Sequence, residues 1–330
     1  MKKLTVFLMV CAFVLSSISF VNAAEKVMLY TSMKESMMGK LKEGFAKKHP
    51  EIAFDYYSAG AGKVMAKIAA ERQAGKIAAD VIWTSEIPDF YKMKGEGILV
   101  KYVSPEAKNI KTPVKDPDGY FTPARLGTLG FAYNTKKVTD PPKSWQDLLD
   151  ARFKGGFAIA NPALSGTAMV SIALIVKAFG WEYIEKLKAN DAIMGQGSGQ
   201  VVDDTASGDY KVALGPDFIV IDKIKKGATM GYVYPNEMLV IPSPVAIFKD
   251  TPNLEAAKKL VDFMFSKEGQ AIIASIGTIP VRTDVPVIEG YGLVSADKAV
   301  KRAMKIDYIK MIDEKEAIIQ KFGSIMREKK

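Results

Sequence analysis

The sequence predicts an α/β protein with two lobes, each containing a mostly parallel sheet flanked by helices. Two observations predict this class. Strand and helix patterns alternate along the chain, as they do where helices cover a parallel sheet. The chain has 330 residues, and the 307 that follow the first 23 exceed what one hydrophobic core usually supports. Its 48% hydrophobic and 25% charged residues are ordinary for a globular protein.

The N-terminal part begins with three strands separated by two helices. We predict strands at 26–30, 52–57 and 79–83, and helices at 35–47 and 62–74. Ligands of such sheets bind outside the carboxyl ends of the strands. The turns that follow the three strands are therefore candidate binding segments, although each taken singly also fits an ordinary turn or helix cap: Thr31-Ser32, Gly60-Ala61-Gly62 and Thr84-Ser85-Glu86.

A second alternating unit begins after Pro123. Two of its predicted strands are followed by carboxylates, Asp217 and Glu237. The chain contains no internal repeat, low-complexity tract or heptad array. The predicted elements of this unit are strands at 126–133, 156–160, 211–214, 231–234 and 245–248, and helices at 144–147, from 165 onward, at 253–266 and at 307–327.

The segment Ser165-Gly166-Thr167-Ala168 is the most informative local signal. It follows Asn161-Pro162 and leads into the apolar run 169–179, so a helix is expected to begin at Ser165. The first N–H groups of a helix lack partners and lie at the positive end of its dipole, and small side chains let an anion approach them. The segment therefore predicts a phosphate or carboxylate site. The alternative is that Ser165 only caps the helix.

The first 23 residues have the pattern of a secretory signal peptide. Lys2 and Lys3 precede an apolar run at 4–15, and Val21-Asn22-Ala23 supplies the small residues that signal peptidase requires. We expect cleavage near Ala23. The sole cysteine, Cys11, lies in the cleaved segment, which excludes disulfide and thiol chemistry in the exported chain. No later segment offers about 20 apolar residues without Gly, Pro or charge, as a membrane anchor requires.

The charge pattern bears on the class of partner. The formal net charge of +9 becomes +7 when the two signal-peptide lysines are removed. The remaining lysines are spread among acidic residues along most predicted helices and do not form one basic arm, which disfavours a nucleic-acid surface. The positive balance mildly favours an anionic ligand.

Taken in order, these segments resemble the ferric-iron and phosphorylated-compound class of periplasmic solute-binding proteins. The resemblance covers nearly all of the predicted mature chain. The segments that carry it are Tyr30-Thr31-Ser32, Gly60-Ala61-Gly62, 80–85, 130–134, Asn161-Pro162 with 165–168, and 257–269.

The resemblance implies the type 2 periplasmic binding fold, with a ligand cleft between the lobes. It places lobe 1 at 24–124 plus 247–279 and lobe 2 at 125–246 plus 280–330, with hinge crossings near Arg125, Val245 and Ile279-Pro280. Closing of the lobes would present the loaded protein to the permease and ATPase of an ABC importer. A periplasmic monomer without a cofactor is expected.

The sequence departs from the members of this class that bind ferric iron. Those members use adjacent tyrosines after the strand that matches 211–214, usually with a histidine from the first strand's exit. Here that stretch reads Gly215-Pro216-Asp217-Phe218. The only histidine, His49, lies in a predicted surface turn, and Tyr56-Tyr57 lies inside a strand, where neighbouring side chains face opposite ways. A ferric site built from carboxylates and a bound anion remains open as the alternative.

The members that bind sugar phosphates or phosphonates fit better. We therefore expect a small phosphorylated or phosphonate organic anion as the solute, with a sugar phosphate favoured. Ser165 and Thr167 would hold the phosphorus oxygens together with backbone N–H groups, and Asp217 and Glu237 would bind hydroxyl groups or an amine. The structural alternative for Asp217 is that it is an ordinary turn residue. The alternative for Glu237 is that it is a solvated surface charge. The remaining candidates are Thr31, Ser32, Ser85, Glu86, Gly166, Ala168 and Ser198.

A secreted hydrolase is the alternative of another class, and the sequence disfavours it. The chain has no G-x-S-x-G motif, and one histidine cannot assemble a zinc site of the His or Cys type. The S-x-x-K match at 295–298 lacks the motifs that accompany it in enzymes. No catalytic residue and no metal site are expected.

Overall fold

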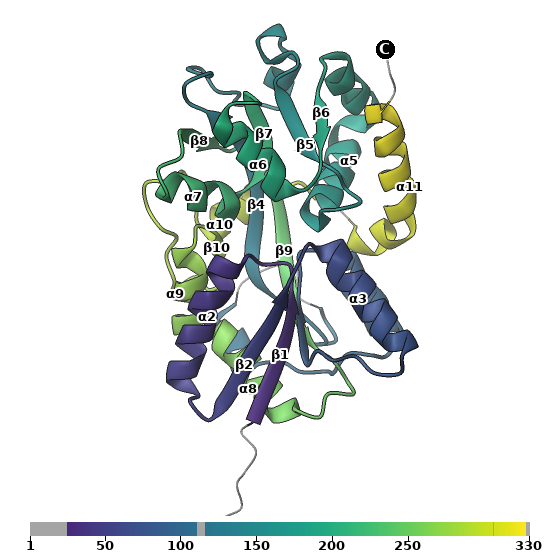
Figure 1. The fold of residues 1–330 in the computed structure, drawn as a ribbon, viewed down its shortest axis with the longest axis vertical. Coiled ribbons are helices and arrows are strands. Elements are labelled where there is room, and N and C mark those ends of the chain that lie inside the picture. Colours follow the sequence, from purple (N-terminus) through teal and green to yellow (C-terminus); the bar gives the residue numbers. More distant parts are fainter. Residues whose placement is uncertain (1–24, 111–115, 306, 328–330) are drawn as a thin grey trace, which may run out of the picture.

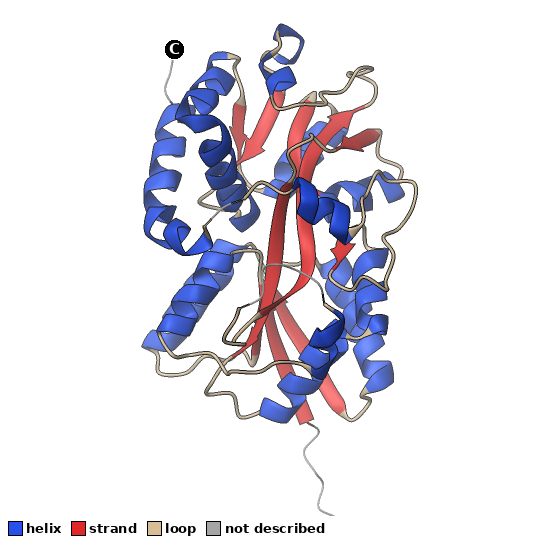
Figure 2. Cartoon of the chain, turned by 180° about the vertical axis from the view of Figure 1, so that it is seen from behind, coloured by secondary structure: helices blue, strands red, loops and turns tan. Residues whose placement is uncertain are grey.

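Two long strands run through the centre of the protein and connect its two halves (Figure 2). The computed structural model describes residues 25–110, 116–305 and 307–327, so the predicted signal peptide lies outside it. The central strands β4 (Thr122–Asn134) and β9 (Leu239–Ile247) are antiparallel neighbours, buried along nearly their whole length. Their register shifts between Pro123 and Arg125, an irregularity that tolerates a residue without an N–H.

The described strands form one mixed sheet in the order β2-β1-β3-β9-β4-β7-β5-β6, and β8 and β10 also pair with β4. The sheet is parallel at its two ends, where β1 pairs with β2 and β3, and β5 with β6 and β7. It is antiparallel in the middle. The remaining bounds are β1 (Glu25–Thr31), β2 (Ile52–Ser58), β3 (Val81–Trp83), β5 (Phe157–Ala160), β6 (Ile193–Gly195), β7 (Val212–Pro216), β8 (Met230–Val233) and β10 (Ile279–Pro280).

Helices cover the sheet in both halves (Figure 1). They are α2 (Glu35–Lys48), α3 (Ala61–Gln73), α4 (Ile87–Gly95), α5 (Gly166–Ala189), α6 (Ser198–Ser207), α7 (Asp217–Lys225), α8 (Leu254–Phe265), α9 (Lys267–Ser275), α10 (Ala296–Arg302) and α11 (Tyr308–Arg327). Three short 3₁₀ helices are Pro105–Asn109, Gln146–Leu149 and Ala151–Phe153.

The helices form because each has an apolar face to bury. In α2, Met37, Leu41 and Phe45 recur every four residues, and all three are fully buried. Two large hydrophobic clusters result, one containing side chains of α2, α8 and α9, the other side chains of α5 and α11. Helix α11 contacts both α5 and α4, so the C-terminal helix touches both halves of the molecule.

Helix α5 is the most apolar helix and forms part of the second cluster. Among the described residues it is the only helix whose length and composition would suit a membrane span, and 56% of its apolar stretch is buried within the protein. That burial is typical of a core helix. A break at Gly180, whose φ is 76°, separates its two segments.

The α/β class is confirmed, and all the predicted strands are present with shifted bounds. Strand β9 was predicted, but it begins at Leu239, six residues before the predicted 245; Pro242 and Pro244 hide its first part, because proline is disfavoured in a central strand. Several elements were not predicted. The glycine-rich run at 195–199 contains the start of α6 at Ser198, a helix that the sequence analysis did not predict. Short helices such as α7 and α10 offer too few turns for their period to stand out.

Candidate functional site

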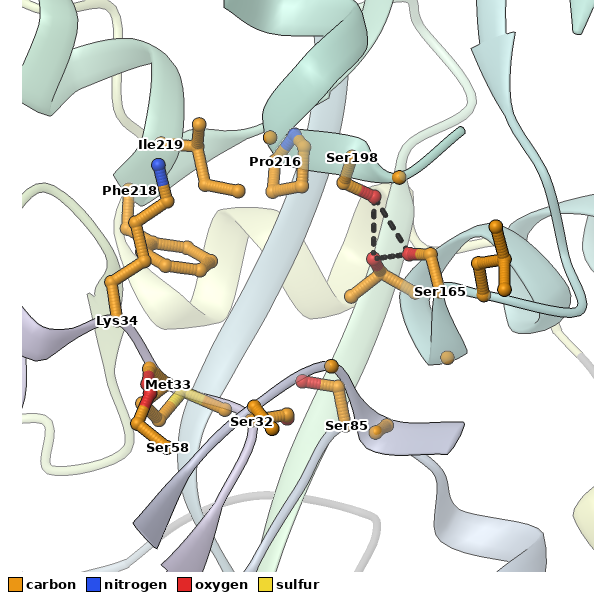
Figure 3. A pocket seen from close by; sticks show the side chains of 18 of the residues that line it. Ser32, Met33, Lys34, Ser58, Ser85, Ser165, Ser198, Pro216, Phe218 and Ile219 are labelled. Atoms are coloured by element: carbon orange, nitrogen blue, oxygen red, sulfur yellow. Dashed lines mark hydrogen bonds between the residues drawn. The ribbon is translucent and has the colours of Figure 1, made fainter. Parts of the chain in front are cut away.

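A cavity of about 320 Å³ lies between the two halves, where the turns after the parallel strands of both halves meet (Figure 3). This is the position expected for a ligand of an α/β sheet. The lining combines small, hydroxyl-bearing, apolar and two cationic residues: Ser32, Met33, Lys34, Ser58, Ala59, Gly60, Ala61, Ser85, Arg125, Leu164, Ser165, Gly166, Thr167, Gly197, Ser198, Gly199, Pro216, Phe218 and Ile219.

Five helices begin at this cavity. The lining includes the residue that precedes each of α2, α3, α5, α6 and α7, namely Lys34, Gly60, Ser165, Gly197 and Pro216. A side chain caps only α5 among these five. The positive ends of five helix dipoles therefore converge on one volume, and such ends favour an anion.

Three hydroxyl groups form a cluster on one side of the cavity. Ser165 Oγ lies 3.0 Å from Thr167 Oγ1 and 2.7 Å from Ser198 Oγ, and the third pair is 3.2 Å apart. Ser165 Oγ also accepts a hydrogen bond from the N–H of Ala168 at 3.3 Å. Ser165 therefore caps α5, which was the alternative to an anion site in the sequence analysis. The cluster brings three of the predicted candidates together from α5 and α6, and each hydroxyl can rotate to donate to an incoming oxygen.

A buried guanidinium reaches the cavity from β4. Arg125 is 1% exposed, and its Nη2 donates to Ser85 Oγ at 3.4 Å while its Nη1 donates to Thr278 Oγ1 at 2.9 Å. Its Nε has no hydrogen-bond partner within the described part of the chain. The guanidinium stacks 4.6 Å from the ring centroid of Phe218. Because Arg125 also belongs to the lining of the cavity, its guanidinium is suited to attract an anionic oxygen there.

Asp217 lies beneath Arg125 and outside the lining of the cavity. It is fully buried, and its Oδ1 is 3.5 Å from Arg125 Nη1. Thr128 and Thr278 donate their hydroxyls to Oδ2 at 2.9 and 3.0 Å, and the Phe218 N–H donates to Oδ1. Burial raises the pKa of Asp217, while Arg125 and these donors act in the opposite direction. The carboxylate thus contacts Arg125 and does not line the cavity, where the sequence had suggested a contact with the solute.

Lys34 supplies the second cation of the lining. It precedes α2, and burial lowers the pKa of its ammonium group. No ion pair involves Lys34 among the described residues. The nearby acids Asp203 and Asp222 each lie 2.8 Å from another lysine, Lys223 and Lys226. The Lys34 ammonium group is therefore available to a ligand.

The turns after β1 and β3 place only some of their predicted residues at the cavity. Ser32 and Ser85 line it. Ser85 Oγ lies 3.0 Å from Ser243 Oγ, which ties the turn to β9. Thr31 is fully buried, and its hydroxyl donates to the Trp83 carbonyl and accepts the Met33 N–H, so it shapes the turn.

Glu86 lies behind the start of α5 in a buried ionic cluster. Lys315 of α11 places its Nζ 2.6 Å from Glu86 Oε2 and 2.9 Å from Asp89 Oδ1. Burial, with the neighbouring Asp89, raises the pKa of Glu86 to about 8. Glu86 does not line the cavity but touches Gly166, because a Cβ at Gly166 would overlap its Cγ and Oε1. It positions the helix start.

The groups that would hold ferric iron lie elsewhere. Glu237, which the sequence suggested as a contact for the polar part of the solute, is exposed in the loop before β9 and does not line the cavity. His49 contacts Glu51 on the surface at 3.2 Å. Tyr56 donates its hydroxyl to Glu35. No phenol, imidazole or carboxylate lines the cavity, and no cluster of three His, Cys, Asp or Glu suited to a metal occurs in the described ranges.

The fold and the cavity define a solute-binding protein of the type 2 periplasmic binding fold, the class that serves ABC importers. The family of bacterial extracellular solute-binding proteins matches residues 77–308, most of the chain, and the protein belongs to that family.

A relative from Salmonella typhimurium, provisionally named a 2-aminoethylphosphonate-binding periplasmic protein, is 28% identical over 261 residues, 74% of each chain. Among solved structures, the periplasmic binding protein AfuA of Actinobacillus pleuropneumoniae with fructose-6-phosphate bound has a TM-score of 0.78 and 25% identity, and covers 92% of this chain and 99% of its own. Iron-bound HitA of Pseudomonas aeruginosa has a TM-score of 0.77 at 22% identity over 90% of this chain and 99% of its own, a likeness of fold alone.

Sequence reasoning missed Arg125, Lys34 and Phe218 as lining residues. Arg125 was noticed only as a hinge position. The sequence did contain a signal for Arg125, because an arginine inside the apolar strand 122–134 requires a buried partner. That partner is Asp217, the acid that follows the neighbouring strand. No local pattern identifies Lys34, because it is one lysine of many before a helix.

Proposed function

We propose that this protein captures a small phosphorylated or phosphonate organic anion, with a sugar phosphate favoured. The observation that carries the proposal is the convergence of five helix N-termini and the Arg125 guanidinium on a cavity without a lining carboxylate. An anion placed there gains backbone N–H donors, the hydroxyls of Ser165, Thr167 and Ser198, and the positive charge of the Arg125 guanidinium.

The size of the cavity supports an organic solute over inorganic phosphate. Its volume of about 320 Å³ lies at the lower end of the range of about 300 to 1,000 Å³ for small-molecule sites. The hydroxyl cluster occupies one side, and the side chains of Met33, Phe218 and Ile219 occupy the other (Figure 3). The names of the Salmonella relative and the bound sugar phosphate of AfuA agree with a phosphorus oxyanion.

The arrangement of the central strands supports the two proposed lobes. The predicted crossings at Arg125 and Ile279-Pro280 are adjacent, because Arg125 pairs with Pro280 of β10 and with Ser243 of β9. We propose that bending at these neighbouring positions closes lobe 2, 125–246 plus 280–330, onto lobe 1, 24–124 plus 247–279. The solute would be enclosed between them and passed to a permease and its ATPase.

We propose that the protein is exported. Cleavage near Ala23 would release a monomeric chain starting at Ala24 into the periplasm. The protein would bind its solute without turning it over, and without a cofactor. Mass spectrometry of the exported protein reports the new N-terminus, and a diacylglyceryl group on Cys11 would contradict the export route proposed here.

Isothermal titration of the processed protein tests the ligand class. The panel contains fructose 6-phosphate, glucose 6-phosphate, 2-aminoethylphosphonate, inorganic phosphate and ferric citrate. We expect at least one organic phosphate or phosphonate to bind more tightly than inorganic phosphate, and incubation with phosphate esters to release no phosphate. A coloured ferric complex that survives gel filtration, without binding of any phosphorus compound, would replace this proposal with the ferric alternative.

A further inference from the structure

The Lys34 side chain does not lie with the hydroxyl cluster. Figure 3 shows Lys34 beside Phe218 on one side of the cavity and Ser165 with Ser198 on the opposite side. Arg125 comes from the central strand β4 and is hydrogen-bonded to Ser85. The cavity thus contains an anion-binding side at the start of α5 and, across it, an ammonium group at the start of α2.

Within the described ranges, no acidic side chain forms an ion pair with the ammonium group of Lys34. The surrounding acids, Asp203 and Asp222, are paired with Lys223 and Lys226. Burial lowers the pKa of Lys34, so the group bears the cost of partial desolvation without a compensating ion pair. A carboxylate or phosphate of a bound solute would provide that compensation.

We propose that the solute carries a second anionic group at the end away from its phosphate or phosphonate, and that Lys34 binds this group. The inference rests on the proposed function, because it assigns the phosphorus oxyanion to the side of Ser165. It narrows the solute to phosphorylated or phosphonate carboxylic acids, such as sugar-acid phosphates.

The same geometry selects against a solute whose far end is an ammonium group. Among the residues that the structure describes, no carboxylate lines the cavity to pair with it, and Lys34 and Arg125 would repel it. This chain and its Salmonella relative, at 28% identity, would thus differ in the far end of the solute they accept.

Pairs of matched ligands measure the contribution of the second anionic group to binding. In each pair the phosphate and the carbon chain are the same, and only a carboxylate is exchanged for a hydroxymethyl group: 6-phosphogluconate with sorbitol 6-phosphate, and 3-phosphoglycerate with glycerol 3-phosphate. We expect the carboxylate member of at least one pair to bind about tenfold or more tightly than its partner, as a charged hydrogen bond would provide.

The Lys34→Gln variant tests the residue. It should reduce the preference for the carboxylate to near unity, and it should weaken binding of the hydroxymethyl partner by a smaller factor than binding of the carboxylate member. Lys47→Gln, on the exposed last turn of the same helix, is the matched control and should keep the preference. Both variants are expected to fold, because neither lysine has an ion pair among the described residues.

The outcomes separate this inference from the proposed function. Equal binding of the two members of both pairs, or a preference that Lys34→Gln retains, overturns the inference and leaves the proposed function intact. Tighter binding of 2-aminoethylphosphonate than of phosphonoacetate also overturns the inference alone. Failure of every phosphate and phosphonate to bind, with binding of ferric citrate, overturns the proposed function and the inference together.

Discussion

The guanidinium of Arg125 and the carboxylate of Asp217, 3.5 Å apart at their nearest atoms, form an ion pair that is almost fully buried beneath the cavity. Arg125 belongs to β4 and Asp217 to the first turn of α7, so the pair joins the central sheet to a helix that begins at the cavity. Gly127 leaves room for it, since a Cβ there would lie 3.0 Å from both terminal nitrogens of Arg125.

Removal of the Asp217 carboxylate should therefore act on stability and on binding together. Asp217→Ala leaves Arg125 buried without a counter-charge, which costs about 3 to 5 kcal/mol of unfolding free energy. Because the acid acts through Arg125, we expect inorganic phosphate and an organic phosphate to lose affinity by similar factors. Urea denaturation and isothermal titration measure the two effects.

Asp222→Asn on the same helix is the control for Asp217→Ala. Asp222 forms a surface pair with Lys226, and its loss should change stability by less than about 1 kcal/mol. If Asp217→Ala folds and weakens only the organic solute, then Asp217 contacts the solute directly, as the sequence alone suggested.

The hydroxyl of Thr167 should contribute to binding and little to folding. It lies within the Ser165 and Ser198 cluster at the start of α5. A hydrogen bond to a charged group is worth about 1.5 to 3 kcal/mol, so Thr167→Ala should weaken binding of the solute by about tenfold to a hundredfold. Isothermal titration against the best ligand of the panel measures this loss.

Ser171→Ala is the matched control for Thr167→Ala. Ser171 lies one turn further along α5, is buried, and donates its hydroxyl to the Thr167 carbonyl. Its loss should leave affinity unchanged. Unchanged binding by Thr167→Ala would show that the anion does not lie at the start of α5.

Gly166 should tolerate no side chain, because Glu86 occupies the space that a Cβ would need. Gly166→Ala should destabilise the fold by about 1 to 3 kcal/mol through overpacking and should weaken binding as the start of α5 moves. Gly199→Ala is the control, since that glycine also lines the cavity and its Cβ would meet nothing within 4 Å. Thermal unfolding and titration are compared for both, and normal behaviour of Gly166→Ala would contradict the close contact with Glu86.

The part of the site that local sequence encodes could be predicted, and the part that depends on the fold could not. Ser165, Thr167 and the start of α5 were predicted because a helix N-terminus is determined by a few consecutive residues. The strands around them followed from hydrophobic periodicity. These signals need no knowledge of which segments meet.

Arg125 and Asp217 illustrate what local signals omit. Both were noticed, one as a crossing point and the other as an acid at a strand exit. Their roles depend on the antiparallel pairing of β4 with β7 and on the side of β4 that faces the cavity, which follow from contacts about 90 residues apart in sequence. Lys34 could not be identified from local sequence either, because its proposed role depends on its position across the cavity from the start of α5.

Glu86 and Lys315 should make stability depend on pH. One ammonium group serves two carboxylates, Glu86 and Asp89, and the excess negative charge with burial raises the pKa of Glu86 to about 8. A folded-state pKa above the unfolded value means that the folded protein binds the proton more tightly. Its contribution to stability is complete below about pH 4.5 and is lost as pH rises toward 8.

We expect the unfolding free energy of the wild type to fall over this window, by at most about 1.4 kcal/mol per pH unit for one proton, relative to Glu86→Gln. The neutral amide keeps the shape of Glu86 and leaves Lys315 paired with Asp89, so the variant should lose the slope and become the more stable protein near pH 8. The pKa of Lys315 is raised by its two partners, so this lysine does not titrate in the window. Urea denaturation at several pH values between 5 and 8 measures the difference, and parallel curves for the two proteins would mean that Glu86 is ionised throughout.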